Sequence, residues 1–176
     1  RVRALDTALV LLAEHELATS TLAVRVAAST RAEPAAAVVS GLATVSGALH
    51  GRAAVGVHRW LLGDPDTGLA SAGFGRVVHR SGDPRFPALR EAIEAISTKR
   101  HRTRIAELLD LGAATQTPNV DAALGALGYV GGMAPGATEG VFAIARTAGW
   151  LAHAFEEYDE KPVRFRGRTL YRGSAG

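Results

Sequence analysis

Apolar residues recur along most of this chain at the three- and four-residue spacing of one helix face, and no stretch shows the alternation typical of a strand. We therefore predict an all-α protein. The expected helices cover residues 4–17, 22–29, 34–49, 53–62, 88–109, 119–130 and 137–157.

Local signals place several of the expected helix ends. Pro34 suits the first position of a helix, and Asn119 is a natural N-cap. Small residues such as Ala37 and Gly41 share one helix face and predict close packing between helices. The arginine-rich segment 162–173 has no helical period, so we expect an extended arm.

Composition narrows the class of protein. The chain has 176 residues, of which 47% are hydrophobic, and this argues for a folded domain. No apolar run approaches the roughly 20 residues that cross a bilayer. Because the sequence contains no cysteine, disulfides and thiolate metal sites are excluded. The net charge is only +3 and no basic helix with base-reading residues stands out, so nucleic-acid binding is not expected. We expect a cytoplasmic location.

One polar segment, residues 73–85, separates two apolar helical stretches and is a candidate binding loop. Its glycines allow close approach of a ligand to the backbone, and its arginines suit an anionic substrate. A solvated surface loop fits the same residues equally well. A dinucleotide site is rejected, because Gly73-x-Gly75 lacks a third glycine and a preceding strand.

Four other residues are candidates for chemistry, although each also has a structural explanation. His15 is expected at a helix C-terminus and Asp121 in a first turn, where each would complement the helix dipole. His50 precedes a helix N-terminus, whose positive end should keep the imidazole neutral and able to donate one hydrogen bond. Arg146 lies in an apolar helix and needs an anionic partner or a route to solvent.

Taken in order along the chain, these motifs closely resemble the C-terminal half of the citrate synthase family. The motifs are His15-Glu16, Leu49-His50-Gly51, Gly73-Phe74-Gly75 through Asp83-Pro84-Arg85, Asn119-Val120-Asp121, Phe142-x-x-x-Arg146-x-x-Gly149 and Arg166 through Gly173. The resemblance covers essentially the whole sequence. It implies a two-lobed helical homodimer that closes around a cleft, with residues 1–52 and 131–176 in the large lobe and 53–130 in the small one. It also implies that the family's N-terminal helices are missing here, so we expect a piece of a longer protein.

The resemblance further implies condensation of acetyl-CoA, or another short acyl-CoA such as propionyl-CoA, with oxaloacetate to give citrate and CoA. In that reaction Asp121 is the base, and His50 polarises the thioester. The residues matching the oxaloacetate ligands are His15, Arg85, Arg146 and Arg166, the last reaching into the partner subunit. Those bordering CoA are Ala72, Gly73, Phe74 and Gly75. Arg164 competes with Arg166 for its role. The family implies no metal and no permanently bound cofactor; acetyl-CoA is a co-substrate.

One position departs from the family pattern. Arg76 stands where the family has a second catalytic histidine, and an arginine cannot donate a proton near neutral pH. Arg76 could instead supply positive charge to the alkoxide that forms on oxaloacetate. Two hypotheses therefore remain. The first is an active synthase, and the second is a catalytically impaired homologue that binds a dicarboxylate or acyl-CoA as a sensor or regulator. A helical module without a ligand is disfavoured, because it leaves Arg146 unexplained.

Overall fold

A computed structural model of the protein describes residues 1–47, 50–66, 68–75, 82–113, 116–167, 170 and 173. Within those ranges the regular structure is helical, and the one backbone pairing of β type is an isolated bridge between Phe74 and Pro118. The all-α prediction is therefore confirmed. The helices are α1 Val2–Leu12, α2 Thr19–Ser29, α3 Pro34–Val45, α4 Ala53–Leu62, α5 Gly68–Ser71, α6 Arg85–Glu94, α7 Lys99–Ala113, α8 Val120–Gly131 and α9 Ala137–Asp159.

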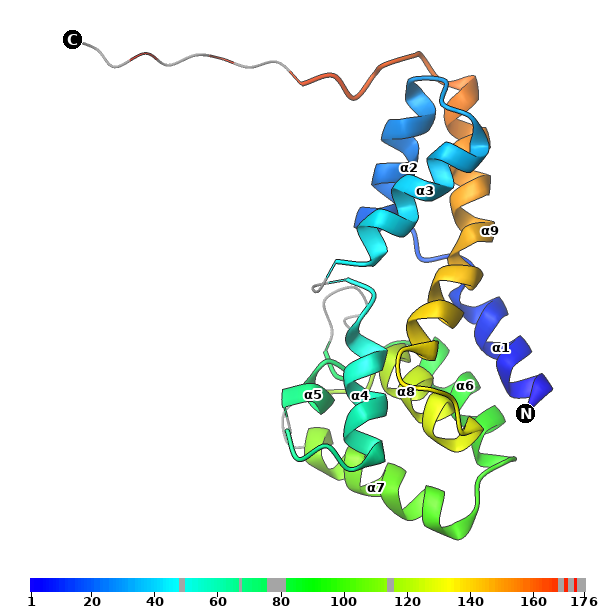
Figure 1. The fold of residues 1–176 in the computed structure, drawn as a ribbon, viewed down its shortest axis with the longest axis vertical. Coiled ribbons are helices and arrows are strands. Elements are labelled where there is room, and N and C mark those ends of the chain that lie inside the picture. The colour runs from blue at the N-terminus through cyan, green and yellow to red at the C-terminus, as the bar shows by residue number, and fades with distance from the viewer. Residues whose placement is uncertain are drawn as a thin grey trace.

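The helices form an elongated molecule, in which α9 runs from the α2–α3 end to the middle (Figure 1). Helices α2 and α3 pack against each other and against the second half of α9. Helices α4 to α8 gather at the other end, where α8 lies between α4 and α6. Helix α1 packs on α6 and α9 and so contacts both groups. That these groups are the two lobes of a closing enzyme stays a prediction.

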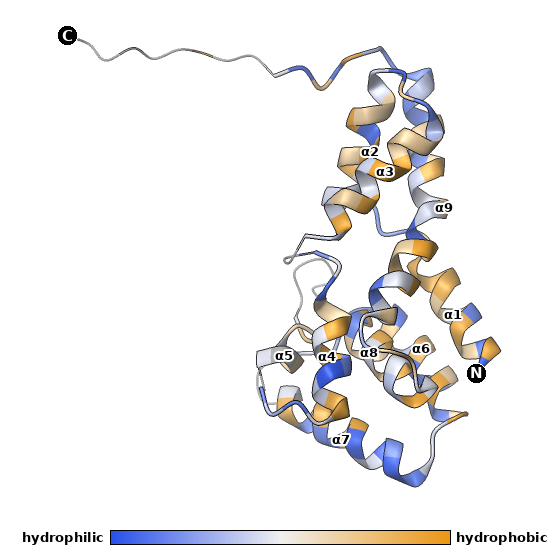
Figure 2. Ribbon diagram, viewed as in Figure 1, coloured by the Kyte–Doolittle hydropathy of each residue, from blue (hydrophilic) through white to orange (hydrophobic). Residues whose placement is uncertain are grey.

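Helix α9 contacts α1, α2 and α3, and hydrophobic residues recur on all four helices (Figure 2). Trp150 of α9 is fully buried where α2, α3 and α9 meet. Gly41 of α3 lies so close to it that a Cβ there would stand 2.8 Å from the indole ring. Only a residue without a side chain allows this approach, which confirms the close packing predicted from the small residues of α3.

Several predicted helix boundaries are wrong. The helix predicted for residues 34–49 ends at Val45. Residues 88–109 belong to two helices, because the helical hydrogen bonding is interrupted at Ser97 and Thr98. The Ser97 hydroxyl donates to the carbonyl of Ile93, and the Thr98 hydroxyl accepts the backbone N–H of His101. The first helix ends at Leu12 and not at residue 17, since the following chain turns and Glu16 takes a φ of 52°. His15 therefore lies in a loop beyond the helix and not in its last turn.

Among the described helices, none combines the length and apolar character that a membrane crossing requires.

Candidate active site

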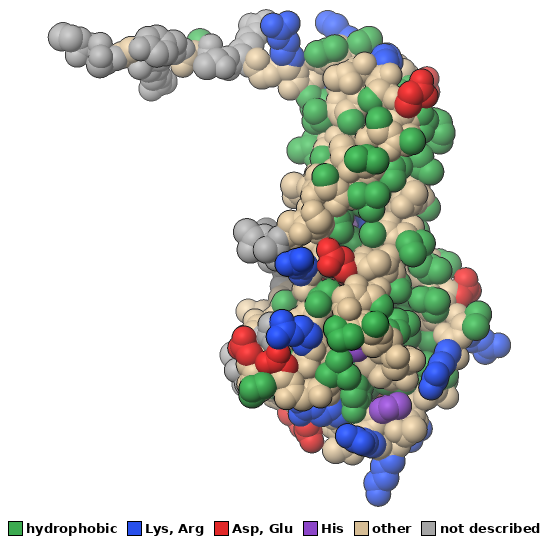
Figure 3. Space-filling view, in the orientation of Figure 1, with side chains coloured by type: hydrophobic (Ala, Val, Ile, Leu, Met, Phe, Trp, Pro, Cys, Tyr) green, Lys and Arg blue, Asp and Glu red, His purple; other side chains and the backbone are tan. Residues whose placement is uncertain are grey.

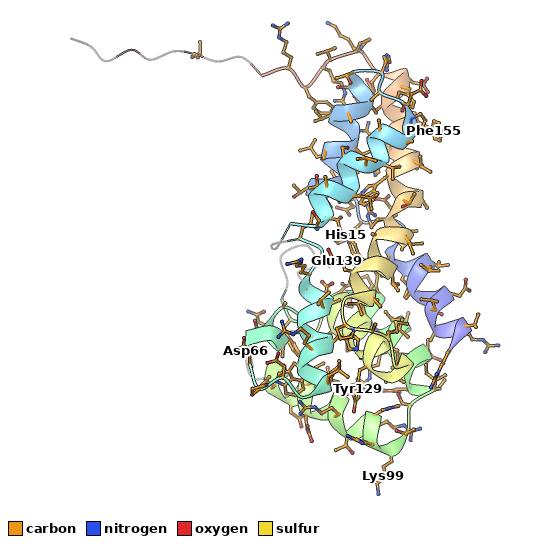
Figure 4. The ribbon with its side chains drawn as sticks, viewed as in Figure 1. His15, Asp66, Lys99, Tyr129, Glu139 and Phe155 are labelled. Carbon is orange, nitrogen blue, oxygen red and sulfur yellow. The ribbon has the colours of Figure 1, made fainter. Side chains whose placement is uncertain are left out.

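A pocket of about 290 Å³ opens where α1, α4, α6, α8 and α9 approach one another. It brings together seven of the predicted site residues from distant parts of the sequence. The full lining is His15, His50, Ala72, Phe74, Gly75, Asp83, Arg85, Asn119, Val120, Asp121 and Phe142. His15 lies level with the gap between α3 and α4, beside α9 (Figure 4).

Arg85, at the start of α6, is held by a buried carboxylate that sequence reasoning missed. Oδ1 of Asp83 accepts hydrogen bonds from Nε of Arg85 at 2.8 Å and from its backbone N–H at 3.0 Å. Oδ2 accepts bonds from NH2 of Arg85 at 2.8 Å and from the backbone N–H of Val120 at 2.9 Å. One carboxylate thus joins the pocket arginine to the N-terminus of α8. The Asp-Pro-Arg sequence indicated only a turn, and the contact with Val120 depends on the fold.

The charges around Asp83 explain its ionisation. Burial opposes the ionised form, but the hydrogen bonds from Arg85 and Val120 more than compensate and lower the pKa of Asp83 to about 2. NH1 of Arg85 also lies 2.9 Å from Nδ1 of His15. Arg85 and His15 are therefore presented to the pocket as one connected pair.

Asp121 lies in the first turn of α8, which Asn119 caps as predicted. The Asn119 side chain accepts hydrogen bonds from the backbone N–H groups of Asp121, at 2.9 Å, and Ala122, at 3.3 Å. Burial raises the pKa of Asp121 to about 6; the positive charge of Arg85 opposes this rise and the negative charge of Asp83 adds to it. A carboxylate with such a pKa is a stronger base than an ordinary aspartate and is still ionised at neutral pH.

His50 is held in a defined tautomer by Ser20 of α2. Nε2 of His50 accepts the backbone N–H of Ser20 at 3.3 Å and lies 3.0 Å from its hydroxyl. A neutral ring that accepts at Nε2 carries its proton on Nδ1. Burial lowers the pKa of His50, and the charge of Arg146 lowers it further. The expected neutral donor is thus supported, although burial, and not the helix dipole, is its main cause.

The loop 72–75 forms the wall of the pocket beside Asp121. The backbone N–H of Gly75 donates to the carbonyl of Thr117, and that of Asn119 donates to the carbonyl of Gly73, both at 3.0 Å. Ala72, Phe74 and Gly75 line the pocket, whereas Gly73 packs behind it, where a Cβ would stand 2.9 Å from Val57. Because Gly75 has a φ of 138°, the wall depends on a glycine at that position.

Two predicted ligands do not line this pocket. Arg146 is fully buried in α9, where it donates to the carbonyl of Ala13 at 3.1 Å and to the hydroxyl of Thr21 at 2.6 Å. The sequence predicts an anionic partner or a route to solvent for Arg146, and Oε2 of Glu14 lies 3.8 Å from Nη1 of this arginine. Arg166 is exposed on the C-terminal arm. Arg76, the departure from the family pattern, lies outside the described residues. In the part of the chain that the structure describes, no group of three or more acidic or histidine side chains could hold a metal ion.

Comparison with known proteins decides the family. The sequence model of the citrate synthase C-terminal domain matches residues 1–168. The chain belongs to the citrate synthase family. It is 32% identical to citrate synthase of Saccharolobus solfataricus, in an alignment covering 98% of this chain and 52% of that protein. It is 31% identical to 2-methylcitrate synthase of Mycobacterium tuberculosis, over 89% of this chain and 44% of that protein.

Solved structures of the citrate synthase family agree with this assignment. The fold matches citrate synthase of Thermoplasma acidophilum in its ternary complex with carboxymethyl coenzyme A and oxaloacetate, with a TM-score of 0.81 and 27% identity. That match covers 99% of this chain and 53% of the other. The citrate synthase of Thermotoga maritima superposes with a TM-score of 0.82 at 25% identity, over 99% of this chain and 54% of the other. This citrate synthase family chain thus spans about half the length of the relatives it matches.

Proposed function

We propose that the chain carries the catalytic residues of a citrate synthase-type enzyme, which condenses acetyl-CoA or another short acyl-CoA with oxaloacetate. The observation that supports this most strongly is the shared pocket. Asp121, His50 and Arg85 are up to 71 positions apart in the sequence, counted from residue 50 to residue 121, and line the same cavity. They supply a base, a neutral hydrogen-bond donor and a cation, which are the three groups that the condensation requires.

Asp121 takes a proton from the carbon next to the thioester carbonyl. The negative charge that develops on the thioester oxygen is stabilised by the N–H at Nδ1 of His50. The enolate then forms a carbon–carbon bond with the ketone carbon of oxaloacetate, and the resulting alkoxide takes up a proton from water. Hydrolysis of the resulting citryl thioester releases citrate and free CoA. A neutral His50 suits this role, because an imidazolium would itself be a competing acid.

Oxaloacetate binding is assigned to His15, Arg85, Arg146 and Arg166, since two carboxylates require several cationic donors. Arg85 and His15 already point into the pocket as a pair. Arg146 is bound to the carbonyl of Ala13, two residues before His15, and its charge acts on His50. Arg166 would come from a second subunit of a homodimer. Ala72, Gly73, Phe74 and Gly75 would border CoA, and Arg76 would face the alkoxide.

A homodimer is consistent with the apolar surface of the α2–α3 end. Figure 3 shows hydrophobic side chains gathered over this end of the molecule. The exposed residues of α2 and α3 include Leu22, Val26, Val39 and Leu42. Exposed apolar patches of this kind mark protein–protein interfaces. We propose that this surface contributes to the subunit contact, and sedimentation of the full-length protein would measure its oligomeric state.

Release of free CoA from acetyl-CoA and oxaloacetate tests the reaction directly. Removing the base by Asp121→Asn should lower kcat by a factor of about 10² to 10⁴. Asp110→Asn makes the same chemical change at an exposed position of α7 and should have little effect. Propionyl-CoA in place of acetyl-CoA reports the acyl preference, since the relatives include both citrate and 2-methylcitrate synthases.

Absence of CoA release from the unaltered full-length protein, with either acyl-CoA, would refute the proposal. Calorimetry with oxaloacetate then distinguishes the remaining possibility. Binding without turnover would indicate the impaired homologue, and a gain of activity in Arg76→His would identify Arg76 as the cause.

A further inference from the structure

A buried carboxylate holds the base of the C-terminal arm. Glu157 lies near the end of α9, and its side chain is fully buried. Its two oxygens accept hydrogen bonds from Nε and NH2 of Arg164, both at 2.6 Å. Nε of Arg25, from α2, donates to Oε2 at 2.9 Å. The pair of Arg164 and Glu157 thus has the bidentate geometry in which arginine–carboxylate contacts are strongest and most directional.

Arg164 is needed for the charge balance at this position. A buried carboxylate is unfavourable unless cations compensate it. Arg25 is shared, because its NH1 also binds Glu156 at 2.8 Å and lies 2.9 Å from Nδ1 of His153. The hydrogen bonds from Arg164 are accordingly the main cause of the lowered pKa of Glu157. The contact therefore ties a segment beyond the helix firmly to the helix itself.

The backbone of Val163, next to this contact, has the left-handed conformation. Val163 has a φ of 55°, a region that β-branched residues rarely occupy. Its N–H donates to the carbonyl of Ser29 at 2.9 Å, and its own carbonyl accepts the N–H of Arg166 at 3.2 Å. Such a conformation persists only where the surroundings enforce it. Glu157 on one side and Ser29 on the other provide that enforcement.

Beyond this turn residues 164–167 leave the helices and run away from the body of the molecule (Figure 1). The guanidinium of Arg164 is occupied by Glu157 and stacks on the ring of Phe165, 4.2 Å from its centroid. Arg166 is exposed, and no hydrogen bond or ion pair of its side chain is found among the described residues. Arg164 and Arg166 were the two candidates for the arginine that reaches into the partner subunit. Arg166 is thus the one whose side chain is available to a second molecule.

We propose that Glu157 and Arg164 are positioning residues, which set the direction of the arm so that Arg166 reaches the site of a second subunit. The inference rests on the proposed function, because that function gives Arg166 a carboxylate of oxaloacetate to bind. An arm without this contact would have to become ordered on ligand binding. Ordering a single residue's backbone weakens affinity by about tenfold, so loss of the contact should appear in oxaloacetate affinity.

The test uses two variants in the full-length protein, Arg164→Met and Glu157→Gln. Arg164 is partly exposed, so its replacement should leave the fold intact even if the Glu157 variant is unstable. Arg90→Met and Glu94→Gln are matched controls, because they alter an exposed pair on α6 that is far from the arm in sequence. Hydrogen exchange is followed at the amides of Val163 and Arg166, and oxaloacetate affinity is measured by calorimetry.

Exchange at both amides should become faster, and the Kd for oxaloacetate should rise by about tenfold, as expected for one newly mobile residue. The KM for acyl-CoA should stay unchanged, which a general loss of structure would not allow. The double variant should bind oxaloacetate no more weakly than the single variant of lower affinity, since the two residues act through one contact.

Each contrary result identifies a different failure. Unchanged exchange at Val163 and Arg166 would show that the contact does not order the arm, and faster exchange with unchanged oxaloacetate affinity would show that the arm carries no ligand. No binding of oxaloacetate by the unaltered protein would also overturn the inference. Absence of CoA release would refute only the proposed reaction, because affinity and exchange are measured without turnover.

Discussion

At the scale of single residues, Asp121 shows how the role proposed for it, that of a base, conflicts with stability. Its pKa is raised to about 6 by burial, so the folded protein holds a proton there more tightly than the unfolded chain does. Ionised Asp121 therefore destabilises the fold at neutral pH, and the penalty disappears as the pH falls through the folded pKa toward the ordinary value. For a rise from 3.8 to about 6 the penalty at pH 7 is up to about 3 kcal/mol.

Asp121→Asn should accordingly raise the free energy of unfolding at pH 7 by up to about 3 kcal/mol, although it should lower kcat. The gain should shrink progressively between pH 6 and pH 4, where the aspartate itself becomes protonated. Urea unfolding of both proteins at several pH values measures the difference. A gain independent of pH would show that ionisation of Asp121 is not its source, and exposed Asp110→Asn serves as the control.

Some residues of the candidate site could be predicted from the sequence and others could not, for a physical reason. Motif order pointed to Asp121, His50 and Arg85, all three of which the fold brings to one pocket. It missed Asp83, whose importance comes from hydrogen bonds to both Arg85 and Val120 across 37 positions. It also attributed the neutrality of His50 to a helix terminus, whereas burial is the larger cause. Burial depends on what packs around a residue and cannot be seen in local sequence.

At the scale of elements, Asn119 connects a helix end with the wall of the pocket. Its side chain caps α8, while its Nδ2 donates to the carbonyl of Ala72 at 3.2 Å. Asn119→Ala should lower the free energy of unfolding by about 1 kcal/mol and raise the KM for acyl-CoA, because the 72–75 wall loses a support. Asn119→Ser retains a capping oxygen and should recover most of the stability but not the KM. Equal KM values for acyl-CoA in the two variants and the unaltered protein would show that Asn119 caps α8 but does not support the 72–75 wall.

Most helices were predictable at this scale, but the short helix α5 and several helix boundaries were not. The apolar period and caps such as Pro34 and Asn119 located most helices correctly. The division between α6 and α7 was missed, since the apolar period continues across Ser97 and Thr98. Their hydroxyls compete for backbone groups, and whether that competition interrupts a helix is decided by tertiary packing.

At the scale of the whole molecule, the junction of α4, α8 and α9 joins the two helical groups. Gly128 of α8 faces His58 of α4 and Thr138 at the start of α9, and all three residues are buried. A Cβ at Gly128 would stand 2.8 Å from Nδ1 of His58 and 2.7 Å from Cγ2 of Thr138. Both distances are shorter than ordinary van der Waals contacts, so an added methyl group must push α4 or α9 away from α8.

Gly128→Ala should therefore lower the free energy of unfolding by about 1–3 kcal/mol, the usual effect of overpacking a core. Gly140→Ala provides the matched control, because it lies exposed in the same helix as Thr138 with no atom near its Cβ, and there alanine should stabilise by up to about 1 kcal/mol. Chemical unfolding of both variants measures the two effects, which should have opposite signs.

If the junction also transmits movement between the helical groups, Gly128→Ala should weaken oxaloacetate binding although it lies outside the pocket lining. Stability lost without any change in oxaloacetate affinity would instead make the junction a packing contact alone.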